Sequence, residues 1–62
     1  MNYEQLVKQL SPGAYAVGTG RQVWIQSAKH LTISEAFSFE RFGAESTRRA
    51  WESAYLRMER KP

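Results

Sequence analysis

The sequence contains no cysteine and no aspartate, and it has a single histidine. Without cysteine the chain forms neither disulfides nor thiolate metal sites, which fits a reducing compartment, so we expect the cytoplasm. His30 has no Cys, Asp or second His to join it as a metal ligand, and we interpret it as an ordinary loop residue. The glutamates are spread along the chain as solvated charges, and no catalytic arrangement is apparent. We therefore expect no enzyme, no metal site and no cofactor.

Long hydrophobic runs are also absent. No apolar stretch approaches the roughly 20 residues that a membrane-spanning helix needs, and the N-terminus lacks the basic segment and apolar core of a signal peptide. We expect a soluble protein that is not exported. Its 62 residues and 7.2 kDa predict one small domain over residues 1–62, whose thin core depends on eight aromatic residues.

The net charge is positive but modest. Nine Lys and Arg against six Glu give +3 and a pI of about 9.7. A charge of this size permits contact with phosphate, yet it is also common in proteins that never meet nucleic acid.

Hydrophobic periodicity predicts an α+β fold, in which a three-stranded antiparallel sheet packs against one C-terminal helix and a short N-terminal helix is added. The N-terminal helix is expected over residues 2–10, with Asn2 as its cap and Leu6, Val7 and Leu10 on one face. The sheet is expected within residues 13–39. Its predicted strands are Gly13 to Val17, Gln22 to Ala28, and the alternating Phe37-Ser38-Phe39. The predicted connections are a tight turn at Gly18-Thr19-Gly20, whose glycines allow positive φ, and a hairpin loop with an apolar anchor from Lys29 to Ser34.

After Gly43 the spacing becomes helical and predicts a helix over residues 44–60, before a frayed end at Lys61-Pro62. The side expected to face the sheet carries Ala44, Thr47, Ala50, Trp51, Ala54 and Met58, with Tyr55 at its edge. Glutamates and arginines form two other stripes with Ser53 between them. Glu45 and Arg49 have the spacing of a helical ion pair. Leu56 lies opposite the core face, which suggests a contact with the N-terminal helix or with a partner.

The order of these motifs resembles a known family. Trp24, the Phe37-Ser38-Phe39 strand, Phe42-Gly43 and a helix with Ala50 and basic residues are similar to the Apetala or ethylene-response-factor type of DNA-binding domain, which also has phage and mobile-element versions. A related arrangement occurs in the arm-binding domains of phage and transposon integrases. The resemblance covers Gly13 to Met58. It implies a three-stranded sheet lying in the DNA major groove, with strand residues reaching base edges and the helix packed behind.

The chain departs from this family in its charge. Family members usually carry several Arg and Lys on the outward sheet face, whereas the sheet region here offers Arg21, Lys29 and His30, with Gln22 and Gln26 as neutral readers. Most of the positive charge lies on the helix. A sheet face with so few cations makes few phosphate contacts.

Two function classes remain open. In the first, the chain is a small non-enzymatic DNA-binding protein, such as a phage or mobile-element regulator of transcription, and its sheet face contacts duplex DNA. The expected contacts are Arg21, Gln22, Trp24, Gln26, Lys29 and Arg41, with Lys8 as a further phosphate contact. The glutamines match adenine edges. Trp24 and Gln26 alternate with Val23 and Ile25, so one pair is exposed or the strand is bulged, and the face of Trp24 stays open.

In the second class, the chain is a protein-binding module such as a phage-encoded inhibitor of a host protein. The expected contacts are Trp24, Tyr15, Arg49, Leu56, Arg57 and Arg60. An exposed Trp is typical of interface hot spots, and the arginines suit an acidic protein surface. An open edge strand can also join a partner's sheet. The first class favours a homodimer or action beside another protein, because so small a domain gains specificity from a partner.

Overall fold

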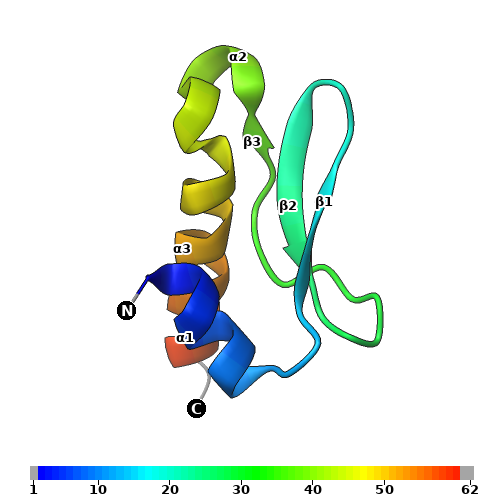
Figure 1. The fold of residues 1–62 in the computed structure, drawn as a ribbon, viewed down its shortest axis with the longest axis vertical. Coiled ribbons are helices and arrows are strands. Elements are labelled where there is room, and N and C mark those ends of the chain that lie inside the picture. Colours follow the sequence, from blue (N-terminus) through cyan, green and yellow to red (C-terminus); the bar gives the residue numbers. More distant parts are fainter. Residues whose placement is uncertain (1, 61–62) are drawn as a thin grey trace.

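The protein has the predicted α+β fold, seen in a computed structural model that describes residues 2–60. The elements are α1 (Tyr3–Leu10), β1 (Tyr15–Gly18), β2 (Gln22–Gln26), β3 (Phe37–Ser38), α2 (Phe39–Phe42), the 3-10 turn η1 (Gly43–Glu45) and α3 (Ser46–Glu59). The strands form one antiparallel sheet in the order β1-β2-β3. Helices α1 and α3 both lie on one side of the sheet (Figure 1). The frayed end predicted at residues 61–62 lies outside the described residues. No helix within residues 2–60 is long and apolar enough to cross a membrane.

Helix α1 begins as the sequence predicts. The Asn2 side-chain oxygen accepts a hydrogen bond from the backbone N–H of Gln5 at 2.9 Å, which satisfies one of the free donors at the helix start. Val7 is fully buried, whereas Leu10 is 55% exposed. The predicted apolar face is therefore wrong at Leu10, the last residue of α1.

Strands β1 and β2 pair over four consecutive residues, from Tyr15 opposite Gln26 to Gly18 opposite Val23. The predicted start of β1 at Gly13 is wrong, because Gly13 has φ of +90° and belongs to the turn after α1. The predicted end of β2 at Ala28 is wrong as well. There Ser27 opens a turn in which its carbonyl accepts the N–H of His30 at 2.9 Å.

The two connections of the sheet differ from each other in how well the sequence predicts them. The predicted turn joins β1 to β2, but neither Gly18 nor Gly20 adopts the positive φ that glycine allows. Thr19 holds the turn instead, and its Oγ1 accepts the backbone N–H groups of Arg21 and Gln22 at 3.1 and 3.2 Å. The predicted hairpin loop is present, and Ile33 is its apolar anchor, packed against the core.

Strand β3 is shorter than predicted. Phe37 lies opposite Val23, but Phe39 is already the first residue of α2. The reason is a cap, because Ser38 Oγ accepts the N–H of Glu40 at 3.1 Å. The predicted C-terminal helix likewise begins later, at Ser46 rather than residue 44, because η1 intervenes.

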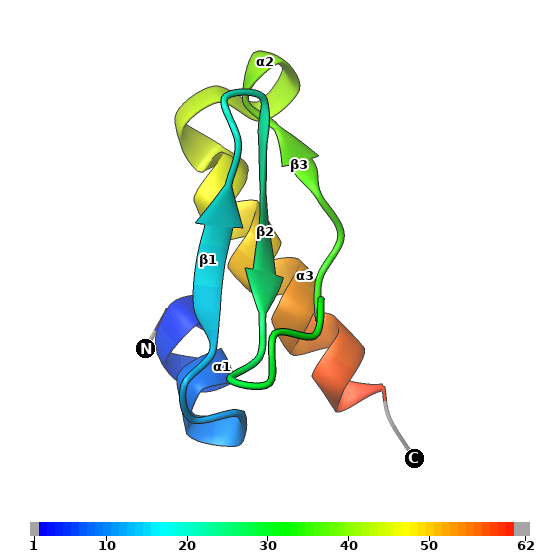
Figure 2. The ribbon, with the colours of Figure 1, turned by 90° about the vertical axis from the view of Figure 1, so that its right-hand side faces the viewer.

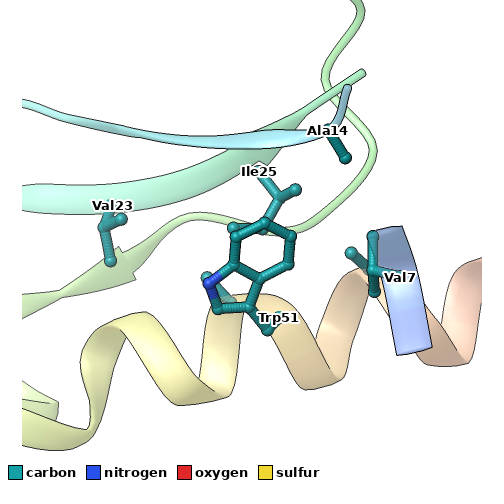
Figure 3. Close-up of a cluster of buried hydrophobic side chains, with 7 residues drawn as sticks. Val7, Ala14, Val23, Ile25 and Trp51 are labelled. Atoms are coloured by element: carbon teal, nitrogen blue, oxygen red, sulfur yellow. The ribbon is translucent and has the colours of Figure 1, made fainter. Parts of the chain in front are cut away.

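The core lies between the sheet and the two long helices. Its buried apolar residues are Val7, Ala14, Val23, Ile25, Ala50, Trp51 and Ala54. The Trp51 ring lies beside Ile25 and on the side of α3 where Val7 of α1 approaches (Figure 3). Ala50 and Ala54 are fully buried, as expected of small residues that let a helix approach a sheet closely.

The buried face of α3 differs from the predicted one. Ala44 and Thr47 are exposed, whereas Ser46 and Ser53 are buried. Residue 44 lies in η1, before the helix, so it does not share the helical face. The serines are buried because they bond to backbone groups, and Ser53 Oγ accepts the N–H of Glu35 at 3.0 Å.

Candidate nucleic-acid interface

The sheet face turned away from the helices carries Trp24. Val23 and Ile25 are buried against the helices, and successive side chains of a strand point to opposite faces. The continuous pairing of β1 with β2 contains no bulge, so Trp24 points outward. The question that the sequence leaves open is thereby answered. We call this surface the outer face, defined by Tyr15, Val17, Gln22, Trp24 and Gln26.

The centre of the outer face is a half-buried pair. Trp24 lies directly opposite Val17 on β1, and residues opposite each other in an antiparallel pair place their side chains on the same side. Gln22 and Gln26 flank Trp24 along β2 and lie about 13 Å apart at the usual rise of a strand. The outer face therefore has an apolar, aromatic centre between two amides.

One of these amides is already bonded within the molecule. Gln26 Oε1 accepts a hydrogen bond from the Tyr15 hydroxyl at 3.0 Å, and Gln26 Nε2 donates to the carbonyl of His30 at 3.4 Å. The Tyr15 hydroxyl also lies 2.6 Å from Nδ1 of His30, and the two rings meet edge to face. Gln22, by contrast, has no side-chain hydrogen bond among the described residues. Of the two predicted readers, only Gln22 presents an unoccupied amide.

The contact between His30 and Tyr15 is the feature of this surface that sequence reasoning does not predict. His30 is a loop residue as expected, and it packs on Tyr15 from the loop after β2. Its φ of +64° is unusual for a residue with a side chain and turns the loop back toward the sheet. No local pattern signals this contact, because it joins residues fifteen positions apart.

Two cations stand at opposite ends of the outer face. Arg21 is exposed in the β1–β2 turn beside Gln22, and Lys29 is exposed in the loop after β2. The chain from Ser11 to Ser34 contains no Asp or Glu, and the acid that approaches this region is Glu40 of α2, which lines a hollow together with Arg21. The two strands that form the outer face, the turn between them and the loop after β2 as far as Ser34 therefore carry only positive or neutral side chains.

The other predicted DNA contacts lie elsewhere. The Arg41 guanidinium lies 5.6 Å from the centre of the Phe42 ring, which in turn packs edge-on against Phe37 on the helix side of the sheet. Lys8 forms an ion pair with Glu4 at 2.7 Å, and its ammonium lies 5.6 Å from the ring centre of Trp51. Arg41 and Lys8 therefore do not form one cluster with Arg21 and Lys29.

The residues predicted to bind a protein partner are divided between two surfaces. Tyr15 and Trp24 belong to the outer face. The other four predicted contacts line an open groove of about 430 Å³ beside α3; they are Arg49, Leu56, Arg57 and Arg60. The rest of the groove is lined by Glu35, Phe37, Glu52 and Ser53. Leu56 is 44% exposed there and does not mediate the contact with α1. Tyr55 does so instead, since its ring lies 5.7 Å from that of Tyr3.

The charges at the start of α3 largely balance each other. Glu45 pairs with Arg48 at 2.6 Å, and with the predicted partner Arg49 at a longer 3.8 Å. The hydrogen bond from Arg48 lowers the pKa of Glu45, and its charge and that of Arg49 add to the effect. Farther along α3, the Glu59 carboxylate accepts a hydrogen bond from the Tyr55 hydroxyl, and this bond raises the pKa of that phenol. Part of the positive charge of α3 is therefore balanced by Glu45, whereas Arg21 and Lys29 form no ion pair among the described residues.

No family model matches this chain, and no curated protein or solved structure matches it either. A function is therefore inferred from the residues and their geometry alone.

Proposed function

We propose that this protein binds duplex DNA through its outer face. One observation carries the proposal: an outward Trp24 and a free Gln22 amide stand between Arg21 and Lys29 on two strands that carry no acidic residue. Cations at both ends suit the phosphate backbone, which supplies most of the affinity for DNA. An amide and an aromatic ring between them suit base edges.

Each side chain has a separate part in this proposal. Arg21 and Lys29 contact phosphates and fix the position of the sheet. The Gln22 amide bonds the N6 and N7 edge of an adenine, and Trp24 supplies apolar contact beside it. Gln26 serves to hold Tyr15 and His30 in place, because its amide is already bonded to both.

The role that follows is regulatory and non-enzymatic. The family resemblance implies a phage or mobile-element regulator of transcription, and the cysteine-free composition fits the cytoplasm.

Fluorescence anisotropy with a labelled random duplex tests the proposal. Two phosphate contacts give a salt slope near −1.8, so affinity should fall by about tenfold between about 50 and about 200 mM salt. Arg21→Ala should reduce the magnitude of this slope by about 0.9. Arg60→Ala removes the same charge from the end of α3 and should leave the slope unchanged. Absence of binding at the lower salt, or equal slopes for both variants, would refute the proposal.

A second candidate function is favoured by the groove beside α3. There Leu56 is 44% exposed next to Phe37, and Arg57 and Arg60 form no ion pair among the described residues. We propose, as the alternative, that this groove binds a host protein, as a phage-encoded inhibitor would. In that case Leu56→Asp should abolish capture of a host protein that Trp24→Asp still captures, and retention by both variants would contradict it.

A further inference from the structure

The two edges of the sheet are finished in different ways. On the β3 side, α3 supplies hydroxyl groups to the exposed backbone. Ser53 Oγ accepts the N–H of Glu35 at 3.0 Å, and Ser46 Oγ, which donates to the carbonyl of Gly43 at 2.6 Å, also lies 3.4 Å from the carbonyl of Ser38. The N–H of Glu35 is thus occupied and a hydroxyl of α3 lies against the carbonyl of Ser38, which partly protects this edge.

The β1 edge has no such protection. Strand β1 has β2 on one side only, as Figure 2 shows. Ala16 lies opposite Ile25, whose own N–H and C=O point the other way, to Ser34 Oγ at 2.8 Å and to the N–H of Ile33 at 2.9 Å. In an antiparallel ladder such a pair turns its backbone groups away from each other. The N–H and C=O of Ala16 therefore point out of the sheet, and no other described residue bonds to them.

The side chains along this edge present no obstacle to pairing. The ten residues from Ser11 to Gly20 include no charged residue. Strand β1 itself reads Tyr-Ala-Val-Gly, with no proline, no lysine and no bulge. Ala16 is exposed and small. Natural proteins usually block open edges with lysine, proline or a bulge, and none of these devices is present.

We propose that β1 pairs with β1 of a second copy of this chain, antiparallel and centred on Ala16. A two-fold axis then places each Ala16 opposite its counterpart, so that one residue supplies both the donor and the acceptor of a reciprocal pair. A second copy fits this edge better than a charged peptide does. Two uncharged β1 edges do not repel each other, and an uncharged edge does not attract a charged peptide.

The symmetry has a consequence for the outer face. Antiparallel pairing of two identical edges requires a two-fold axis perpendicular to the sheet, so both outer faces point the same way. The result is a continuous six-stranded sheet with the helices of both copies on the opposite side. The two β2 strands would lie about 14 Å apart, at the normal strand spacing. The inference does not depend on DNA binding, although it would double the proposed DNA surface.

The dimer is expected to be weak. A strand pairing of this length buries a surface area at or below the low end of the range for specific interfaces, which begins at about 1,200 Å². Association should therefore appear only at high protein concentration.

Two measurements without DNA test the inference. In sedimentation equilibrium, the average mass should rise toward twice that of the chain between about 10 µM and about 1 mM, the range expected of a small interface. Amide hydrogen exchange should show Ala16 becoming more protected over the same range. Val17 serves as the internal control, because its N–H belongs to the β1–β2 ladder and should be protected throughout.

Substitutions at Ala16 supply matched controls. Ala16→Lys places like charges across the two-fold axis and Ala16→Pro removes the outward N–H, so both variants should stay monomeric. Ala16→Ser keeps the N–H and a small side chain and should still associate. Circular dichroism shows whether each variant is folded. If Ala16→Pro does not fold, the result for Ala16→Lys decides the test. A parent chain that stays monomeric at the highest concentration, or an Ala16→Lys variant that dimerises like the parent, would overturn the inference.

Discussion

Gly13 holds the turn between α1 and β1 in a conformation that side chains rarely adopt. Its φ is +90°, and a Cβ at this position would lie 2.8 Å from Cβ of Ala28. Gly13→Ala should therefore lower the free energy of unfolding by about 1–3 kcal/mol, from backbone strain and steric conflict together. Gly20 is the matched control, because it lacks a positive φ and has open space around it.

Urea denaturation of both variants tests this prediction. Gly20→Ala should change the free energy of unfolding by no more than about 0.5 kcal/mol. Equal midpoints for the two variants would show that the turn does not constrain Gly13.

The glycines also show where residue-level prediction ends. The Gly18-Thr19-Gly20 pattern indicates a turn, and a turn is found, but the Thr19 hydroxyl rather than a positive φ holds it. Glycine permits many conformations and specifies none, so its type alone does not reveal which glycine needs its freedom. At Gly13 the deciding neighbour, Ala28, comes from a loop far along the chain.

The ion pair between Glu45 and Arg48 predicts a pH dependence at one residue. Arg48 lowers the pKa of Glu45 below its ordinary 4.5. The pair therefore adds stability above the ordinary pKa of Glu45, and this contribution is lost as the pH falls through the lowered value. Both side chains are more than half exposed, so the effect on stability is small.

A carbon-13 NMR titration of the Glu45 carboxyl measures this effect directly. Arg48→Ala should raise the pKa of Glu45 toward its ordinary value, because the largest cause of the shift is then removed. Arg57→Ala removes the same charge farther along α3 and should leave this pKa nearly unchanged. An unaltered titration in Arg48→Ala would mean that the ion pair is not formed in solution.

At the scale of the strand, substitution of two neighbouring residues of β2 should have different effects, one mainly on stability and the other mainly on DNA binding. Ile25 is fully buried, whereas Trp24 is on the outer face. Ile25→Ala should lower the free energy of unfolding by about 2–5 kcal/mol, which is large for so small a domain. Trp24→Ala should cost less than Ile25→Ala despite removing a larger side chain, and should weaken DNA binding instead.

Thermal unfolding followed by circular dichroism, together with anisotropy, separates these outcomes. A Trp24→Ala variant less stable than Ile25→Ala would reverse the assignment of the two faces.

Helix α3 shows why its buried face was only partly predicted. The small Ala50 and Ala54 and the large Trp51 mark that face correctly. Ser46 and Ser53 share it, but a periodicity argument places serine at the surface. Their burial depends on backbone groups near β3 that need hydrogen bonds, and these become visible only when the strand and the helix are brought together.

At the scale of the whole molecule, the layered fold follows from the sequence more readily than the candidate site does. Alternation and helical spacing indicate which elements form, and the structure has a sheet covered by helices as expected. The outer face depends instead on how strands align. Pairing of Trp24 with Val17 and the approach of His30 to Tyr15 join distant segments, and no local pattern encodes them.

The distribution of charge is also a property of the whole molecule. One glutamate lies at residue 4 and the other five lie from residue 35 onward, so strands β1 and β2 and the turn between them contain no acid. A net charge of +3 does not reveal this separation. It is the separation, more than the total charge, that supports the outer face as the DNA-binding surface.

A nitrogen-15 NMR titration with a short DNA duplex tests that central claim most directly. The largest shift changes should fall on the Trp24 indole N–H, the Gln22 side-chain amide and the backbone around Arg21 and Lys29. The backbone amides around Leu56 on α3 should change little. Changes centred on α3, with the Trp24 indole unmoved, would contradict the assignment of the outer face as the DNA-binding surface.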